Sequence, residues 1–88
     1  MELDKRICRY LADNLLYVDD GFEYDNDTSF IDQGLIDSTG VMELVMYVQS
    51  EFDITVDPHE VTPDNFDSVN KLAAFVRRKQ AVLVQPTR

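Results

Sequence analysis

The middle of the chain carries a helical pattern that must bury one of its sides. Its apolar residues recur three or four positions apart, at Val41, Leu44, Val45, Val48 and Phe52. Because an α-helix turns by about 100° per residue, this spacing places them on a single face. We expect a helix that begins at Asp37 or Ser38, after a turn at Gly34, and packs this face against other helices.

Two more segments have the same spacing of apolar residues. One runs from Leu3 to Val18, and the other follows Asp67-Ser68 with inward positions at Val69, Leu72, Ala73, Phe75 and Val76. Before the last helix, Asp57-Pro58-His59-Glu60 reads as a helix start, with Asp as N-cap and proline at the first helical position. Thr62-Pro63-Asp64-Asn65 should interrupt that helix after one or two turns. The sequence therefore predicts an all-α fold, a small bundle of three longer helices plus one short helix.

The length of the chain limits what this bundle can enclose. With 88 residues, 44% of them apolar, the chain can build one domain with a modest core, too small for a deep catalytic cavity. We expect this domain, a free-standing one, to span residues 1–80. Residues 81–88 should form a frayed C-terminal tail, since Pro86 stops any helix.

Charge is distributed unevenly along the chain. All eight lysine and arginine residues lie outside Tyr10–Asn70, whereas 15 of the 17 acidic residues lie inside that window. Nucleic acid is a poor partner for such a surface, because phosphate binding needs a basic footprint. A basic patch on a protein partner would suit it, and an equally good interpretation is that acidity keeps a small protein soluble and monomeric.

The chain shows no basic-plus-apolar leader and no apolar run that approaches a membrane span. Cys8 is the only cysteine, so an internal disulfide is impossible, and the thiol is better read as a small packing residue than as a reactive group. We expect a soluble protein of the cytoplasm.

The Asp37-Ser38 pair at the start of the second helix can be read in two ways. A serine hydroxyl at the first residue of a helix is well placed to carry a phosphodiester, because free N–H groups and the positive end of the helix dipole face the phosphate. Serine and aspartate are also the commonest N-caps, and taken alone the pair favours capping.

Intrinsic catalysis has little support in the sequence. The nucleophile-elbow pattern G-x-S-x-G fails at Ser38, since Ile36 stands two residues before it. His59 is the only histidine and thus the only candidate base, and one histidine with one cysteine makes no convincing zinc site. We expect neither an enzyme nor a metal site.

The order of motifs along the chain supplies the context that the pair lacks. The helix through Phe52 is preceded by Phe30-Ile31-Asp32-Gln33-Gly34-Leu35-Ile36-Asp37-Ser38, and it is followed by Ile54-Thr55-Val56 and by Val61-Thr62-Pro63-Asp64-Asn65-Phe66-Asp67-Ser68. From about Leu3 to Lys79 the chain resembles the phosphopantetheine-carrying proteins, which are acyl carrier proteins and peptidyl or aminoacyl carrier proteins. The resemblance implies an acyl carrier protein-like fold. It also implies that Ser38 receives 4′-phosphopantetheine, derived from coenzyme A, through a phosphopantetheinyl transferase.

The residues after Ser38 indicate which branch of the carrier family the chain resembles more. The family's usual leucine is replaced here by Thr39, with Gly40 next, and Asp-Ser-x-Gly together with Gln49-Ser50-Glu51-Phe52 is more similar to D-alanyl and aminoacyl carriers than to fatty-acid carriers. This implies a protein that holds an aminoacyl group as a thioester, takes it from an adenylating or other loading enzyme and delivers it to acyl-accepting enzymes. The alternatives are an acyl carrier for fatty-acid or polyketide-type biosynthesis, and an unmodified acidic interaction module on the same fold.

The helix after Ser38 should also present a docking surface to partners. Helical spacing points several residues away from the core face, among them Thr39, Met42, Glu43 and Met46. Flexible thioethers suit surfaces that pack against more than one partner. We therefore predict a partner face of Asp37, Thr39, Met42, Glu43 and Met46, with the alternative that Met42 flanks the core.

Overall fold

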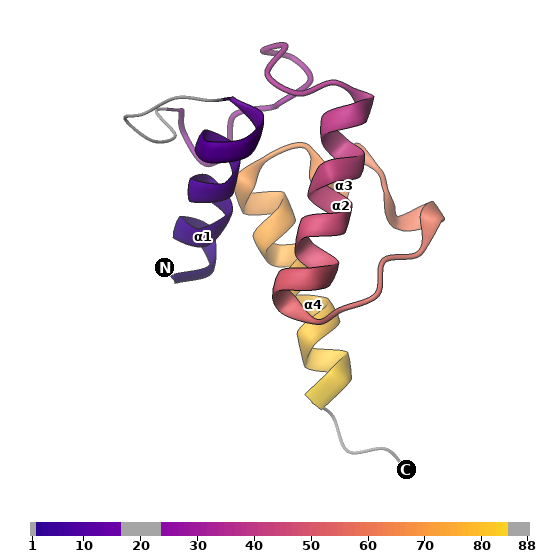
Figure 1. Cartoon of the computed structure of the whole chain (residues 1–88). Coiled ribbons are helices and arrows are strands. Elements are labelled where there is room, and N and C mark those ends of the chain that lie inside the picture. The colour runs from indigo at the N-terminus through magenta and orange to yellow at the C-terminus, as the bar shows by residue number, and fades with distance from the viewer. Residues whose placement is uncertain (1, 17–23, 85–88) are drawn as a thin grey trace.

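The computed structural model describes residues 2–16 and 24–84, and every regular element within them is helical (Figure 1). The elements in chain order are α1 (Glu2–Tyr10), the π-helical turn η1 (Leu11–Leu15), α2 (Ser38–Phe52), the 3₁₀ turn η2 (Pro58–Glu60), α3 (Pro63–Phe66) and α4 (Val69–Val84). The predicted all-α bundle, with three longer helices, is confirmed. None of the helices in the described ranges has both the length and the apolar character needed to span a bilayer.

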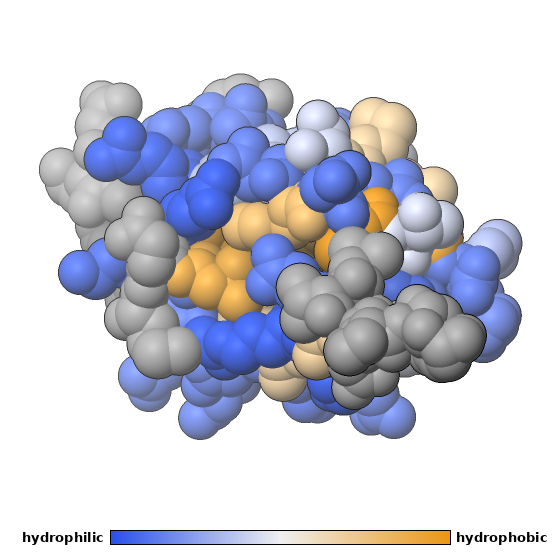
Figure 2. Space-filling view, turned by 90° about the horizontal axis from the view of Figure 1, so that it is seen from below, coloured by the Kyte–Doolittle hydropathy of each residue, from blue (hydrophilic) through white to orange (hydrophobic). Residues whose placement is uncertain are grey.

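Helix α4 is the element on which the others pack. It contacts α1, α2 and α3, and in Figure 1 it lies between α1 and α2. The apolar positions predicted for α4 are all buried, as are Leu44, Val45, Val48 and Phe52 of α2, whereas Val41 is half-buried. On the face seen from below, apolar residues are visible near the centre and hydrophilic residues lie around them (Figure 2).

The first helix differs from the single helix expected over Leu3 to Val18. Its α-helical part ends at Tyr10, and the last turn widens so that the N–H of Leu16 donates to the carbonyl of Leu11 at 2.8 Å. Leu11 and Ala12 are both buried, and the wider turn lets these adjacent side chains face the core together. The end predicted at Val18 lies outside the described residues.

The segment between α2 and α4 corrects the predicted position of the short helix. Pro58–Glu60 forms only one 3₁₀ turn, and the short α-helix begins at Pro63, where an interruption was expected. Proline is tolerated at the first helical position because the N–H that it lacks would have no intrahelical partner there. Pro63 therefore starts a helix and does not break one.

Helix α4 also runs beyond its predicted end. Residues Ala81 to Val84 are helical and not part of a tail, while residues 85–88 lie outside the described ranges. Proline disfavours the helical conformation mainly at the residue before it, so Pro86 leaves the chain free to stay helical through Val84.

Candidate functional site

The loop that leads into α2 is fixed by two backbone turns and by Asp67. Gly34 adopts the left-handed conformation expected for it, with φ of 65°, and the N–H of Leu35 donates to the carbonyl of Phe30 at 2.8 Å. The Asp67 carboxylate accepts hydrogen bonds from the Ser29 hydroxyl at 2.5 Å and from the Ile31 N–H at 3.0 Å. These contacts tie the loop to the residues that precede α4.

Both carboxylate oxygens of Asp67 are taken up by these contacts, so the N-cap of α4 comes from the next residue. The Ser68 hydroxyl accepts from the Lys71 N–H at 3.1 Å and is itself the cap. The link from Asp67 to the distant Ser29 and Ile31 joins residues more than 35 positions apart in the chain. Such a link has no local sequence signal.

Helix α2 is capped by Asp37. The backbone of Asp37 is extended, with φ of −99° and ψ of −172°, and its Oδ1 accepts from the Gly40 N–H at 2.9 Å. Both features are those of an N-cap residue. Asp37, and not Ser38, thus provides the side-chain acceptor for an N–H group of the first turn. The interpretation of Ser38 as a cap is wrong.

Ser38 is the first residue of α2 and its side chain is exposed. Within the described part of the chain, its hydroxyl makes no hydrogen bond, and the N–H groups of Ser38 and Thr39 find no acceptor. A helix N-terminus with unpaired N–H groups attracts negative charge. The hydroxyl at this position is accordingly accessible and lies beside an anion-favouring helix end.

A cavity of about 440 Å³ opens beside Ser38. Helix α2 and the loop before it supply one side of the cavity, and the segment through η2 and α3 supplies the other. Seven of the ten lining residues are apolar. The lining residues are Ile31, Ile36, Asp37, Ser38, Val41 and Met42 on the first side, and Val61, Thr62, Pro63 and Phe66 on the second.

The residues predicted to form one partner face point in two directions. Met42 and Met46 are 54% and 61% exposed, so Met42 is not a core residue, and it lines the cavity beside Ser38. Thr39 and Glu43 line a separate hollow with Gly34 and Leu35, on another side of α2. Asp37 borders both hollows.

Ile31 belongs to the apolar surface beside Ser38 but was not predicted there. It is 56% exposed, whereas its neighbour Phe30 is 1% exposed. The available signal was the Phe30-Ile31 pair itself, because adjacent apolar residues in a tight turn cannot both face the core. Helical spacing could not detect it, since the residue lies in a loop.

Cys8 offers no competing nucleophile. Burial raises the pKa of its thiol, and the nearby Asp4 carboxylate raises it further. The sulfur donates to Asn26 Oδ1 at 3.7 Å, and the side chain packs against the core. These contacts fit the predicted role as a packing residue, because the thiolate is the reactive form and a raised pKa depletes it.

Comparison with known proteins identifies the family. Residues 5–76 match a family model described as the phosphopantetheine attachment site. The chain belongs to this family of phosphopantetheine-dependent carrier proteins. The carrier is 31% identical over 61 residues to the D-alanyl carrier protein of Lactococcus lactis subsp. lactis (strain IL1403), a match that covers 69% of the carrier and 77% of that relative.

Two further relatives match over most of their length. The D-alanyl carrier protein of Lactobacillus delbrueckii subsp. bulgaricus (strain ATCC BAA-365 / Lb-18) is 29% identical over 80 residues, which is 91% of the carrier and 96% of the relative. A protein named probable acyl carrier protein PigG, from Serratia sp. (strain ATCC 39006), is 26% identical over 80 residues, or 90% of each chain. The carrier is thus similar to D-alanyl carriers, its family's cofactor is 4′-phosphopantetheine, and carrier proteins are not themselves catalysts.

Proposed function

We propose that Ser38 carries 4′-phosphopantetheine and that the protein holds an aminoacyl group as a thioester on this arm. The observation that carries the proposal is the exposed Ser38 hydroxyl, unpaired within the described residues, at the first position of α2 beside an apolar cavity. When attached, the group supplies a flexible arm that ends in a thiol. The arm raises the effective concentration of its cargo at the active site of each partner enzyme.

The surroundings of Ser38 fit a phosphodiester. The N–H groups of Ser38 and Thr39 have no acceptor within the described residues, and they and the positive end of α2 would favour a negative phosphate at Ser38. Asp37 already caps the helix through Gly40, so esterification of Ser38 removes no hydrogen bond from the first turn. Apolar residues at the cavity wall, such as Val41 and Pro63, lie within reach of an arm that leaves Ser38.

Partner enzymes would dock on the apolar surface beside Ser38. Ile31, Met42 and Met46 are each more than half exposed, and large exposed apolar side chains of this kind are typical of interaction surfaces. The proposed partners are a phosphopantetheinyl transferase, an adenylating or other loading enzyme, and an acyl-accepting enzyme. Asp37 borders this surface, whereas Thr39 and Glu43 lie on another side of α2, where they would contact partners through charge and hydrogen bonding.

An aminoacyl cargo is favoured by the relatives, since two of the three described above are named D-alanyl carrier proteins. A fatty or polyketide acyl cargo is the second candidate. It is supported by the apolar lining of the cavity beside Ser38 and by the relative named as a probable acyl carrier protein.

The first experiment is the intact mass of the protein after incubation with coenzyme A and a broad-specificity phosphopantetheinyl transferase. The wild-type protein should gain one phosphopantetheinyl group, and Ser38→Ala should gain none. Ser50→Ala is the matched control, because Ser50 is an exposed serine of the same helix and its loss should leave the gain intact. An unmodified but folded wild-type protein would contradict the proposal and favour an interaction module.

The modified protein then distinguishes the two cargoes. It is offered to an enzyme that adenylates D-alanine and to an enzyme that transfers fatty acyl groups, and the thioester is detected by mass. Loading only by the first supports the aminoacyl carrier. Loading only by the second shows that the protein is an acyl carrier.

A further inference from the structure

The cavity beside Ser38 has one wall that comes from outside α2. Val61, Thr62, Pro63 and Phe66 form this wall, which we call the η2–α3 wall. Within the described residues, a single hydrogen bond ties the segment over residues 54–66 to α2, from the Val56 N–H to Gln49 Oε1 at 2.9 Å. Further polar contacts fix the segment from another helix.

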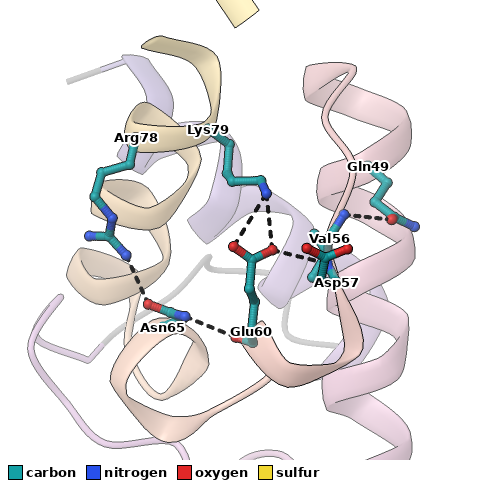
Figure 3. A network of polar contacts seen from close by, with 7 residues as sticks. All are labelled: Gln49, Val56, Asp57, Glu60, Asn65, Arg78 and Lys79. Carbon is teal, nitrogen blue, oxygen red and sulfur yellow. Dashed lines mark hydrogen bonds and ion pairs between the residues drawn. The ribbon is translucent and has the colours of Figure 1, made fainter. Parts of the chain in front are cut away.

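They come from α4 through Lys79 and Glu60 (Figure 3). Lys79 Nζ donates to both carboxylate oxygens of Glu60, at 3.0 and 3.3 Å, and one of these oxygens also accepts from the Asp57 N–H at 2.9 Å. The carboxylate thus joins η2 to α4. Both side chains of the ion pair are only about one quarter exposed, which reduces screening by water compared with a fully exposed pair.

A second set of contacts runs beside the first. Arg78 donates to Asn65 Oδ1 at 2.9 Å, and Asn65 Nδ2 donates to the Glu60 carbonyl at 2.9 Å (Figure 3). The ring of Phe66 packs on that of Phe75, with centroids 5.3 Å apart. Three residues of α4, Phe75, Arg78 and Lys79, therefore contact the wall at Phe66 or the residues next to it.

We propose that Lys79 and Glu60 act as positioning residues that hold the η2–α3 wall away from α2 and so keep the cavity beside Ser38 open. Apolar surfaces face each other across the cavity, Val41 and Met42 on α2 and Val61 and Pro63 on the wall. The hydrophobic effect favours their contact, and a wall anchored on α4 cannot make it. Access to the cavity is then set by contacts with α4.

That an open cavity matters for cargo rests on the proposed function. The positioning role of Lys79 and Glu60 is tested on the unmodified protein. Lys79→Met removes the charge and keeps the aliphatic stem, and Lys71→Met makes the same change at an exposed position of the same helix. Amide hydrogen exchange is followed at Val61, Asn65 and Phe66, whose N–H groups donate to backbone carbonyls within the segment.

Lys79→Met should speed exchange at these amides by about tenfold, the scale expected for the loss of a charged hydrogen bond in a locally opening segment. Exchange at Leu44 and Val48 of α2 should stay at the wild-type rate, as should all exchange in Lys71→Met. Lys79→Arg keeps the charge, so its amide exchange rates should match those of the wild-type protein. Unchanged exchange in the wall, or an equal rise in α2, would overturn the positioning role.

Closure of the cavity is measured separately by nuclear Overhauser contacts to the methyl group of Met42. New contacts from Met42 to Val61 and Pro63 are expected in Lys79→Met and not in Lys71→Met. Their absence would show that the wall does not close and would overturn the proposal. Both measurements use protein without the arm, so failure of Ser38 modification would refute the carrier function and leave the positioning role standing.

Discussion

Ile36 occupies the space in which a side chain at Gly40 would begin. A Cβ atom on Gly40 would lie 2.4 Å from Ile36 Cγ2, and Ile36 is itself buried with only 9% of its surface exposed. The Gly40 N–H is at the same time held by Asp37. Loop and helix therefore meet at Gly40 more closely than any other residue would permit, directly beside Ser38.

Gly40→Ala should destabilise the protein despite the better helix propensity of alanine. Propensity alone would stabilise α2 by about 1 kcal/mol, whereas overpacking against Ile36 costs about 1–3 kcal/mol. We expect a net loss of about 1 kcal/mol, measured by urea unfolding. A more stable Gly40→Ala protein would show that Ile36 moves aside freely.

Asp53→Gly should stabilise the protein. Asp53 follows α2 in the left-handed conformation, with φ of 56° and ψ of 49°, and its carboxylate lies at the negative end of the helix dipole. Glycine removes both the backbone strain and the unfavourable charge, which should raise the free energy of unfolding by about 0.5–1 kcal/mol. Asp53→Ala removes the charge but keeps the backbone strain, so it should be less stable than Asp53→Gly, and equal stability of the two would contradict the prediction.

Glu60→Gln should destabilise the protein at neutral pH and not in acid. The hydrogen bond from the Asp57 N–H, followed by that from Lys79, lowers the pKa of Glu60. A folded-state pKa below the unfolded value of about 4.3 gives a stabilisation that is present above that pH and is lost as the pH falls through the folded pKa. Denaturant midpoints of wild type and variant should differ at pH 7 and converge near pH 3. A difference that stays constant with pH would contradict this.

Met46→Glu should impair loading by a partner enzyme while leaving the fold intact. Met46 is 61% exposed, so stability should change by no more than about 0.5 kcal/mol. Loss of an apolar contact from the docking surface should lower kcat/KM for loading by about tenfold, on the scale of an interface residue worth more than 1 kcal/mol. Ser50→Glu adds the same charge to another exposed position of α2. An equal loss of activity in both variants would point to charge and not to the docking surface.

The parts of the fold that depend on periodic spacing could be predicted. The buried residues of α2 and α4 repeat every three or four positions, and the glycine turn at Gly34 follows from local backbone preference. The same spacing placed Met42 and Met46 outside the core, where the structure has them.

The features that depend on competition between neighbouring residues could not be predicted. Asp37 and Ser38 are both good N-caps, and only the backbone geometry shows that Asp37 takes the role. Pro63 can end one helix or start the next, and the packing of α3 on α4, through Phe66 and Phe75, favours a start. The contacts of Lys79 with Glu60, and of Asp67 with Ser29, join distant parts of the chain and leave no periodic trace.

The division of roles between the adjacent residues Asp37 and Ser38 has a consequence for how the protein would be used. If one residue both capped the start of the helix and carried the attached group, each attachment or removal of the group would disturb the first turn of the helix. Under the proposed function the two tasks would fall to neighbouring residues, and Asp37 would keep its hydrogen bond from the Gly40 N–H when Ser38 is modified. Partner enzymes would then meet a domain of the same fold before Ser38 is modified, after it is modified, and at each exchange of cargo.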